Sequence, residues 1–339
     1  MSVWFSLPVV AVASLALTGS VTRYAPSRGL IDVPGARSSH TVPTPRGGGI
    51  AIVVCFLASL IPLIVLEVQS RSTLVALLGA GAVVGLVGLA DDRWHVAPQW
   101  RLLVHVAAAA WVLSWLHGAP SVPFFGSLLD LGWFGSIIAA LCLVWLVNLY
   151  NFMDGIDGIA AVEAICVCGA GAALYALVDE PSSAITPLLL TASAAGFFFW
   201  NFPPARIFMG DVGSGFLGIT LGGLALQAAL ASPRLLWSWF ILLAVFVTDA
   251  TFTLVRRLLH REKAHEAHRS HAYQHAARRF GHLPVTLAVG AIDVVWLLPI
   301  AWWVGSGNFE GLWGAMLAYA PLIALAAYFK AGKAEEPAG

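Results

Sequence analysis

Five aspartates stand at the ends of long apolar runs, in three separate segments of the chain. They are Asp91, Asp92, Asp154, Asp157 and Asp211. Carboxylates in or near hydrocarbon are costly and are usually functional. Carboxylate oxygens are also the ligands that Mg²⁺ and Mn²⁺ prefer. These aspartates could therefore hold a divalent cation beside a phosphate, although hydrated helix ends would carry the same residues.

The adjacent pair Asp91 and Asp92 closes one of the apolar runs. Neighbouring residues on a helix diverge by about 100°, so the two carboxylates should have different roles. We predict that both are catalytic. One of them, which we take to be Asp92, should bind the metal, and the other should act on the nucleophile or support the metal's ligands.

A second segment places polar residues at every third position, at Asn148, Asn151, Asp154 and Asp157. If the helix continues through them, these side chains form one slowly winding stripe. A glycine follows each aspartate, which favours a close approach of the backbone to a bound molecule. We predict that the two aspartates are catalytic and that the two asparagines bind substrate. A hydrated helix end is the alternative.

The third segment runs from Asn201 to Gly215 and enters the next apolar run at about Ser214. Glycines and a serine at a helix N-terminus offer free amides and the positive end of the helix dipole, which suits a phosphate. An aspartate beside such a phosphate makes sense when a cation lies between them. We therefore predict that Asp211 binds Mg²⁺ or Mn²⁺. An ordinary capped loop between helices is the alternative.

One loop, Asp32–Gly49, is stiffened by its prolines and opened by its glycines. Its basic side chains, Arg37, His40 and Arg46, could clamp anionic oxygens and are predicted to bind substrate. A loop that only anchors the chain by its positive charge would look much the same.

A second loop is rich in histidine. His268, His271 and His275 would share one face of a helix, and Arg269 lies among them. A zinc site is one interpretation. The neighbouring arginine, together with the lack of a nearby acid on that face, favours recognition of an anion.

These segments must be positioned by helices in lipid. Of 339 residues, 59% are hydrophobic and 11% are charged, whereas soluble domains have about 25% charged residues. The formal net charge is zero, and no basic tail or groove suggests that the chain binds nucleic acid. The four cysteines all lie in apolar runs, which is typical of packing residues.

About eleven runs are long and apolar enough to cross a bilayer, which takes about 20 residues. Their approximate bounds are 2–22, 48–66, 73–90, 101–117, 132–150, 159–178, 184–200, 214–231, 235–255, 285–304 and 312–329. We therefore predict an all-α, polytopic membrane protein that forms a single domain over residues 1–339. The motifs occupy residues 25–280, two helices follow over 285–329, and residues 330–339 form a tail.

The basic residues set the orientation of these spans. With the first run ending in the cytoplasm, 16 of the 18 Lys and Arg residues fall on the cytoplasmic side, and only Arg71 and Arg234 fall opposite. The positive-inside rule favours this arrangement. It predicts a periplasmic N-terminus, a cytoplasmic C-terminus and an active site on the cytoplasmic face, because all the aspartate motifs lie on that side.

Five ordered motifs on one membrane face resemble those of the polyprenyl-phosphate N-acetylhexosamine-1-phosphate transferases. This family includes the enzymes that start peptidoglycan lipid, teichoic acid and O-antigen synthesis. The matching pieces are the Asp32–Gly49 loop, Asp91-Asp92, Asn148–Gly158, Asn201–Ser214 and the histidine loop 268–271. The sequence around the histidines looks closest to the O-antigen-initiating branch, which implies a role in lipopolysaccharide synthesis.

The resemblance implies an enzyme of the bacterial inner membrane that needs Mg²⁺ or Mn²⁺. Such an enzyme moves the sugar 1-phosphate of a UDP-N-acetylhexosamine to undecaprenyl phosphate and releases UMP; a homodimer is left open. By resemblance, Asp91 and Asp92 lie next to the lipid phosphate, and Asp211 binds the metal. Asp154 and Asp157 border the nucleotide–sugar pocket, and Asn201 and Phe208 lie near the base. His268 and His271 are catalytic and face the diphosphate, and Arg269 is a substrate ligand.

For the mechanism, we expect a single in-line attack by the lipid phosphate, because its second pKa is about 6 and it is largely dianionic at neutral pH. A covalent aspartyl-phosphate route is the alternative. A transporter or flippase would also carry intramembrane acids such as Glu163, Asp249 and Asp293. Its acids would lie near the midplane, however, and not at one face. A CDP-alcohol phosphotransferase is the other enzyme considered, but the spaced aspartate pattern of that class is missing.

Overall fold

The computed structural model describes residues 3–34, 42–260 and 269–333, and most of these residues are helical. The α-helices are α1 (Ser6–Tyr24), α2 (Ile50–Val65), α3 (Arg71–Trp94), α4 (Pro98–Trp115), α5 (Gly132–Met153), α6 (Ile159–Leu174), α7 (Ile185–Asn201), α8 (Asp211–Ala231), α9 (Arg234–Leu242), α10 (Ala244–Leu259), α11 (Ala272–Phe280), α12 (His282–Ile292), α13 (Leu298–Gly305) and α14 (Gly311–Tyr328). The short 3-10 helices are η1 (Val3–Phe5), η2 (Ala25–Arg28), η3 (Tyr175–Leu177) and η4 (Pro181–Ala184), and η5 (Asp293–Leu297) is a π-helix that joins α12 to α13.

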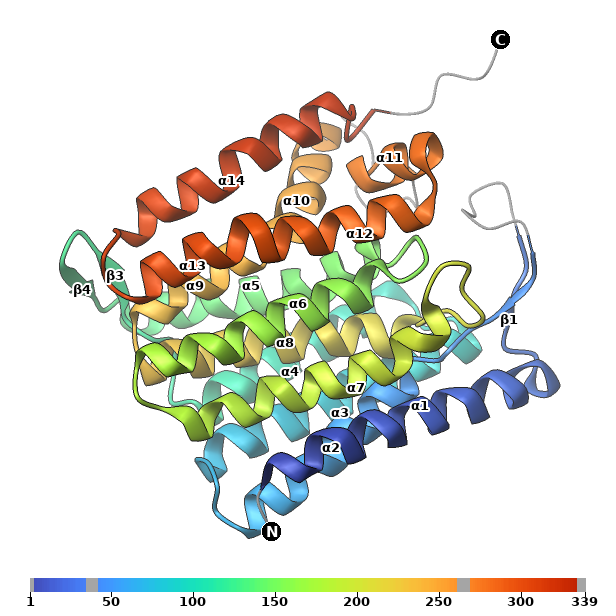
Figure 1. Ribbon diagram of the computed structural model, residues 1–339, viewed down its shortest axis with the longest axis horizontal. Coiled ribbons are helices and arrows are strands. Elements are labelled where there is room, and N and C mark those ends of the chain that lie inside the picture. Colours follow the sequence, from blue (N-terminus) through green and yellow to red (C-terminus); the bar gives the residue numbers. More distant parts are fainter. Residues whose placement is uncertain (1–2, 35–41, 261–268, 334–339) are drawn as a thin grey trace.

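Two small antiparallel sheets lie at opposite ends of the helical bundle (Figure 1). Strand β1 (Ile31–Asp32) pairs with β2 (Thr44–Pro45), and β3 (Val122–Phe124) pairs with β4 (Ser127–Leu129). The β1–β2 pair lies at the same end of the bundle as α11 (Figure 1).

The described residues contain eight helices that are long and apolar enough to cross a membrane, judged by length and composition. A ninth would be the pair α9 and α10, which are bent by 68° at Leu243. The protein is thus an all-α polytopic membrane protein, as predicted. Each of the eleven expected runs contains a helix, but α2 has only 16 residues, and the count of eleven spans stays a prediction.

Helix α8 lies inside the bundle and packs against α3 and α5. Small residues permit this packing, as is usual between membrane helices. A Cβ on Gly218 of α8 would come within 2.5 Å of the carbonyl oxygen of Leu146, and one on Gly88 of α3 would come within 2.4 Å of the carbonyl oxygen of Asp211. The close approach at Gly88 brings the end of α3, with its two aspartates, to the start of α8.

Candidate active site

A cavity of about 270 Å³ opens where these helix ends meet. It is lined by charged and polar residues from five parts of the chain, namely Asp32, Arg46, Asp92, Asn151, Asp154, Asp157, Asn201, Asp211, Ser214, Gln274 and His282, with Gly155, Ile156, Phe208 and Gly210. The first loop and the three aspartate segments therefore converge as predicted. The catalytic role of each of these residues stays a prediction.

Asp92 fastens α3 to the N-terminus of α8. Its Oδ1 accepts the Asp211 amide and its Oδ2 accepts the Val212 amide, both at 3.1 Å, and the residue is only 4% exposed. These amides are among the donors that a helix N-terminus leaves without intrahelical partners. Both carboxylate oxygens of Asp92, the predicted metal ligand, thus accept hydrogen bonds that hold the start of α8 in place.

Asp91 points to a different partner, as its position on the helix predicts. Its Oδ1 accepts the Val96 amide at 2.7 Å, and its Oδ2 accepts a hydrogen bond from Arg101 of α4. The same Arg101 nitrogen lies 3.2 Å from Oδ2 of Asp211. One guanidinium therefore links the two acid motifs. Arg101 is a site residue that the sequence motifs did not predict, although its place one turn into an apolar helix was a signal.

The first loop is clamped onto the segment before α8. Phe208 donates its amide to Pro45 at 2.8 Å, and Gly48 donates its own to the Phe208 carbonyl at 2.9 Å. Arg46, as predicted, reaches the site and donates to the backbone oxygen of Asp92. The other two basic residues predicted in this loop, Arg37 and His40, lie outside the described residues.

Helix α5 ends at Met153, so the stripe predicted through Asp157 is interrupted. Gly158 has φ +78°, a left-handed conformation that glycine adopts readily, and the backbone turns into α6 there. Asn148 remains on the helix and donates to the Val144 carbonyl at 2.7 Å. Asp154 lies in the turn, within the cavity. Burial, and then the nearby carboxylates of Asp211, Asp92 and Asp157, raise the pKa of Asp154 well above its ordinary value.

Asp157 and Asn201 tie neighbouring loops together. Asp157 Oδ2 accepts the Ala205 amide at 3.1 Å and lies 3.2 Å from Nδ1 of His282. Asn201, 2% exposed, accepts the Gly158 amide at 3.0 Å and donates to the Ile207 carbonyl at 2.8 Å. Both side chains line the cavity, but their bonds within the protein also shape it. His282 was missed because it lies 125 residues beyond Asp157 in the chain.

The histidine loop differs from its prediction. His271 is the N-cap of α11, so it does not continue one helical face with His275, and an acid does lie nearby: Nδ1 of His271 is 3.3 Å from Oδ1 of Asp249. His271 is 3% exposed and does not line the cavity, whereas Gln274 of α11 does. Arg269, the predicted substrate ligand, does not line the cavity. His268 lies outside the described residues.

A second cavity of about 270 Å³ adjoins the first, and the two share Asn151 and Asp211. Asp91, Arg101, His105 and Asn148 form its polar part, and Val84, Val87, Leu102, Val147 and Phe152 supply apolar side chains. This cavity suits a ligand with a charged head and an apolar tail. The first cavity, rich in hydrogen-bonding groups, suits a polar ligand, so two different ligands could meet at Asp211.

The family model of glycosyl transferase family 4 matches residues 74–229. A probable undecaprenyl-phosphate N-acetylglucosaminyl 1-phosphate transferase of Bacillus subtilis is 30% identical over 273 residues, which cover 79% of this chain and 75% of that protein. A decaprenyl-phosphate N-acetylglucosaminephosphotransferase of Mycobacterium leprae is 31% identical and covers 81% and 79%. A phospho-N-acetylmuramoyl-pentapeptide-transferase of Moorella thermoacetica is 32% identical over 198 residues, which cover 54% of this chain and 61% of that protein.

Proposed function

Because the chain belongs to glycosyl transferase family 4, we propose that it transfers an N-acetylhexosamine 1-phosphate from a UDP-sugar to a polyprenyl phosphate. The products are the polyprenyl diphosphate-sugar and UMP. The observation that carries this proposal is the pair of cavities that meet at Asp211, one polar and one half apolar. A reaction between a water-soluble nucleotide and a lipid requires such a pair.

The acceptor occupies the cavity between α3, α4 and α5. Its phosphate lies at Arg101, which is the basic side chain of that cavity, and its isoprenoid chain follows Val84, Leu102 and Val147 toward lipid. The donor occupies the polar cavity, with its diphosphate toward Asp211 and its sugar toward Asp154 and Gln274. The β-phosphorus of the donor then lies between the two ligands.

The lipid phosphate attacks directly. One of its oxygens forms a bond to the β-phosphorus, while the bond from that phosphorus to the bridging oxygen breaks and the electron pair leaves with UMP. The acceptor is already a dianion near neutral pH, so the barrier comes mainly from bringing two anions together. Both oxygens of Asp91 and both of Asp92 are engaged in hydrogen bonds, which supports direct attack over a covalent aspartyl intermediate.

A divalent cation fits this site. The carboxyl groups of Asp91 and Asp211 contact the same nitrogen of Arg101, and a cation would stabilise two carboxylates held this close together. Among the described residues no three His, Cys, Asp or Glu side chains form a ready metal site. This agrees with Mg²⁺, which usually takes one or two carboxylates and completes its shell with phosphate oxygens and water. Asp211, which lines both cavities, would hold it, and it would neutralise the donor diphosphate.

The finer assignments remain our predictions. They are undecaprenyl phosphate as the acceptor, a UDP-N-acetylhexosamine as the donor, the start of O-antigen or lipopolysaccharide synthesis, a homodimer and the bacterial inner membrane. The relatives named above include both undecaprenyl- and decaprenyl-phosphate enzymes. Neither relative is named for O-antigen synthesis, so the pathway has to come from the identified product.

The test of function is an assay of membranes that contain the protein. We expect incubation with a panel of UDP-N-acetyl sugars and C50 or C55 polyprenyl phosphate to give a polyprenyl diphosphate-sugar, identified by mass, and one UMP per product. Membranes with the Asp211→Asn variant are the control. Movement of a lipid-linked sugar across vesicles without a new product would instead indicate a flippase, and release of CMP from CDP-alcohols would indicate the other phosphotransferase class.

The orientation in the membrane can be tested across α8. Arg206 precedes this helix and Ser232 follows it, and 21 helical residues extend about 31 Å. In a cysteine-free background, we expect Arg206→Cys to be labelled only after the inner face is opened and Ser232→Cys to be labelled from outside. Labelling of Arg206→Cys in intact cells would place the site on the periplasmic face and contradict the positive-inside prediction.

A further inference from the structure

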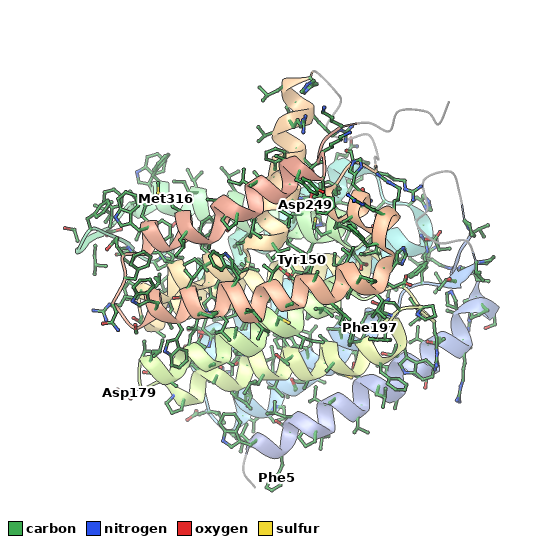
Figure 2. The ribbon with its side chains drawn as sticks, turned by 45° about the horizontal axis from the view of Figure 1, so that its top comes forward. Phe5, Tyr150, Asp179, Phe197, Asp249 and Met316 are labelled. Carbon is green, nitrogen blue, oxygen red and sulfur yellow. The ribbon has the colours of Figure 1, made fainter. Side chains whose placement is uncertain are left out.

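Asp249 is a buried acid of α10 that lies outside both polar cavities. Its Oδ2 accepts the Tyr273 amide and its Oδ1 accepts the Ala272 amide, both at 2.9 Å, and Oδ1 also faces Nδ1 of His271. A carboxylate that accepts amides at a helix N-terminus satisfies donors that the helix itself leaves unpaired. Asp249, marked in Figure 2, therefore attaches the start of α11 to the bundle.

Helix α11 also contacts the loop between α5 and α6, which carries Asp154. The Tyr273 hydroxyl donates to the Phe152 carbonyl at 2.9 Å. A Cβ on Gly155 would lie 2.1 Å from the same hydroxyl and 3.3 Å from Nε2 of Gln274, so the turn is packed directly on α11. Gln274 lines the polar cavity, and its Oε1 accepts the His271 amide at 3.1 Å.

We propose that Asp249 is a positioning residue for the donor half of the site. It acts through α11, because Tyr273 fixes the turn around Asp154 and Gln274 presents its amide group to the cavity. The assignment to the donor half rests on the proposed function, whereas the attachment of the turn to α11 does not. The acceptor half shares Phe152 with this connection, but Asp91 and Arg101, which meet the lipid phosphate, lie on α3 and α4 and bond to each other.

The kinetic test uses Asp249→Asn and Tyr273→Phe. An asparagine keeps one acceptor oxygen but replaces the other with NH₂, which cannot accept an amide; phenylalanine removes only the hydroxyl. We expect each variant to raise KM for the UDP-sugar about tenfold and to leave KM for polyprenyl phosphate unchanged. The double variant should be no worse than the more impaired single variant, because both changes break one connection. Asp293→Asn, which removes a buried carboxyl elsewhere, is the matched control and should keep the wild-type KM values.

The structural test does not need activity. Hydrogen exchange of the peptide over residues 150–158 should become at least about tenfold faster in Asp249→Asn and in Tyr273→Phe, and it should be unchanged in Asp293→Asn. Additive kinetic effects in the double variant, equal rises in both KM values, or unchanged exchange in this peptide would each overturn the proposal. If Asp249→Asn fails to fold, Tyr273→Phe alone still tests the connection. A wild-type protein without transfer activity would refute the proposed function but leave the exchange result informative.

Discussion

Replacing Arg101 with glutamine should lower kcat/KM for the polyprenyl phosphate by roughly 10²–10³, the usual cost of losing one charged donor at a reacting anion. Arg101 contacts Asp91 and Asp211 through one nitrogen, and it is the guanidinium of the half-apolar cavity. Without it, the lipid phosphate would approach two carboxylates with no positive side chain between them. Initial rates at varied polyprenyl phosphate and saturating UDP-sugar measure the effect.

Two further variants separate charge from geometry. Arg101→Lys keeps the charge but replaces a planar fork with a single ammonium group, so we expect an intermediate loss of about tenfold. Arg93→Gln is the matched control, because Arg93 lies at the end of α3 beside Asp92, is exposed and donates to the Arg28 carbonyl outside both cavities. Its activity should stay within about twofold of wild type. A rise in KM for the UDP-sugar alone in Arg101→Gln would assign this residue to the donor.

The helices could be predicted because lipid imposes a simple pattern. A bilayer needs long apolar runs, and every run expected from the sequence contains a helix. The breaks were harder to predict, because they depend on contacts between distant segments. Helix α5 ends at Met153, where the following Gly155 packs against Tyr273, more than 110 residues later in the chain. The 68° bend between α9 and α10 likewise falls in an uninterrupted apolar run.

The residue types of the candidate site can be predicted from the sequence more directly than the contacts that those residues make. Aspartates at helix ends are visible in the sequence, but whether a carboxylate binds a metal or a backbone amide is decided by the neighbouring helix. Asp92 is predicted to bind the metal, and the structure adds that both of its oxygens accept amides of α8. His271 was predicted without a nearby acid, yet Asp249 lies beside it. Gln274 and His282 were not predicted at all, because neither belongs to an acidic motif.

Removing divalent cations, or changing Asp211 to asparagine, should abolish transfer. With EDTA we expect no product, and Mg²⁺ or Mn²⁺ should restore the rate. Asp211→Asn should lower kcat by about 10³ or more. The reason is that the neutral amide binds a divalent cation poorly, so the charge of the donor diphosphate is no longer neutralised. The measurement is UMP release in detergent, with each cation titrated against wild type and variant. Full activity in EDTA would contradict a metal-dependent reaction.

The contacts of Asp211 make this variant informative, because its side chain and backbone have different tasks. The Asp211 amide donates to Asp92 and keeps the end of α3 on α8, and this bond survives in Asp211→Asn. The Asp211 carboxylate contacts Arg101 at a partly exposed position, so thermal stability should change little. Asp92→Asn is the comparison: there one acceptor for the α8 amides is replaced by a donor, and both stability and activity should fall. Equal loss of stability in the two variants would show that Asp211 is needed for the fold and would remove the reason to assign it to a cation.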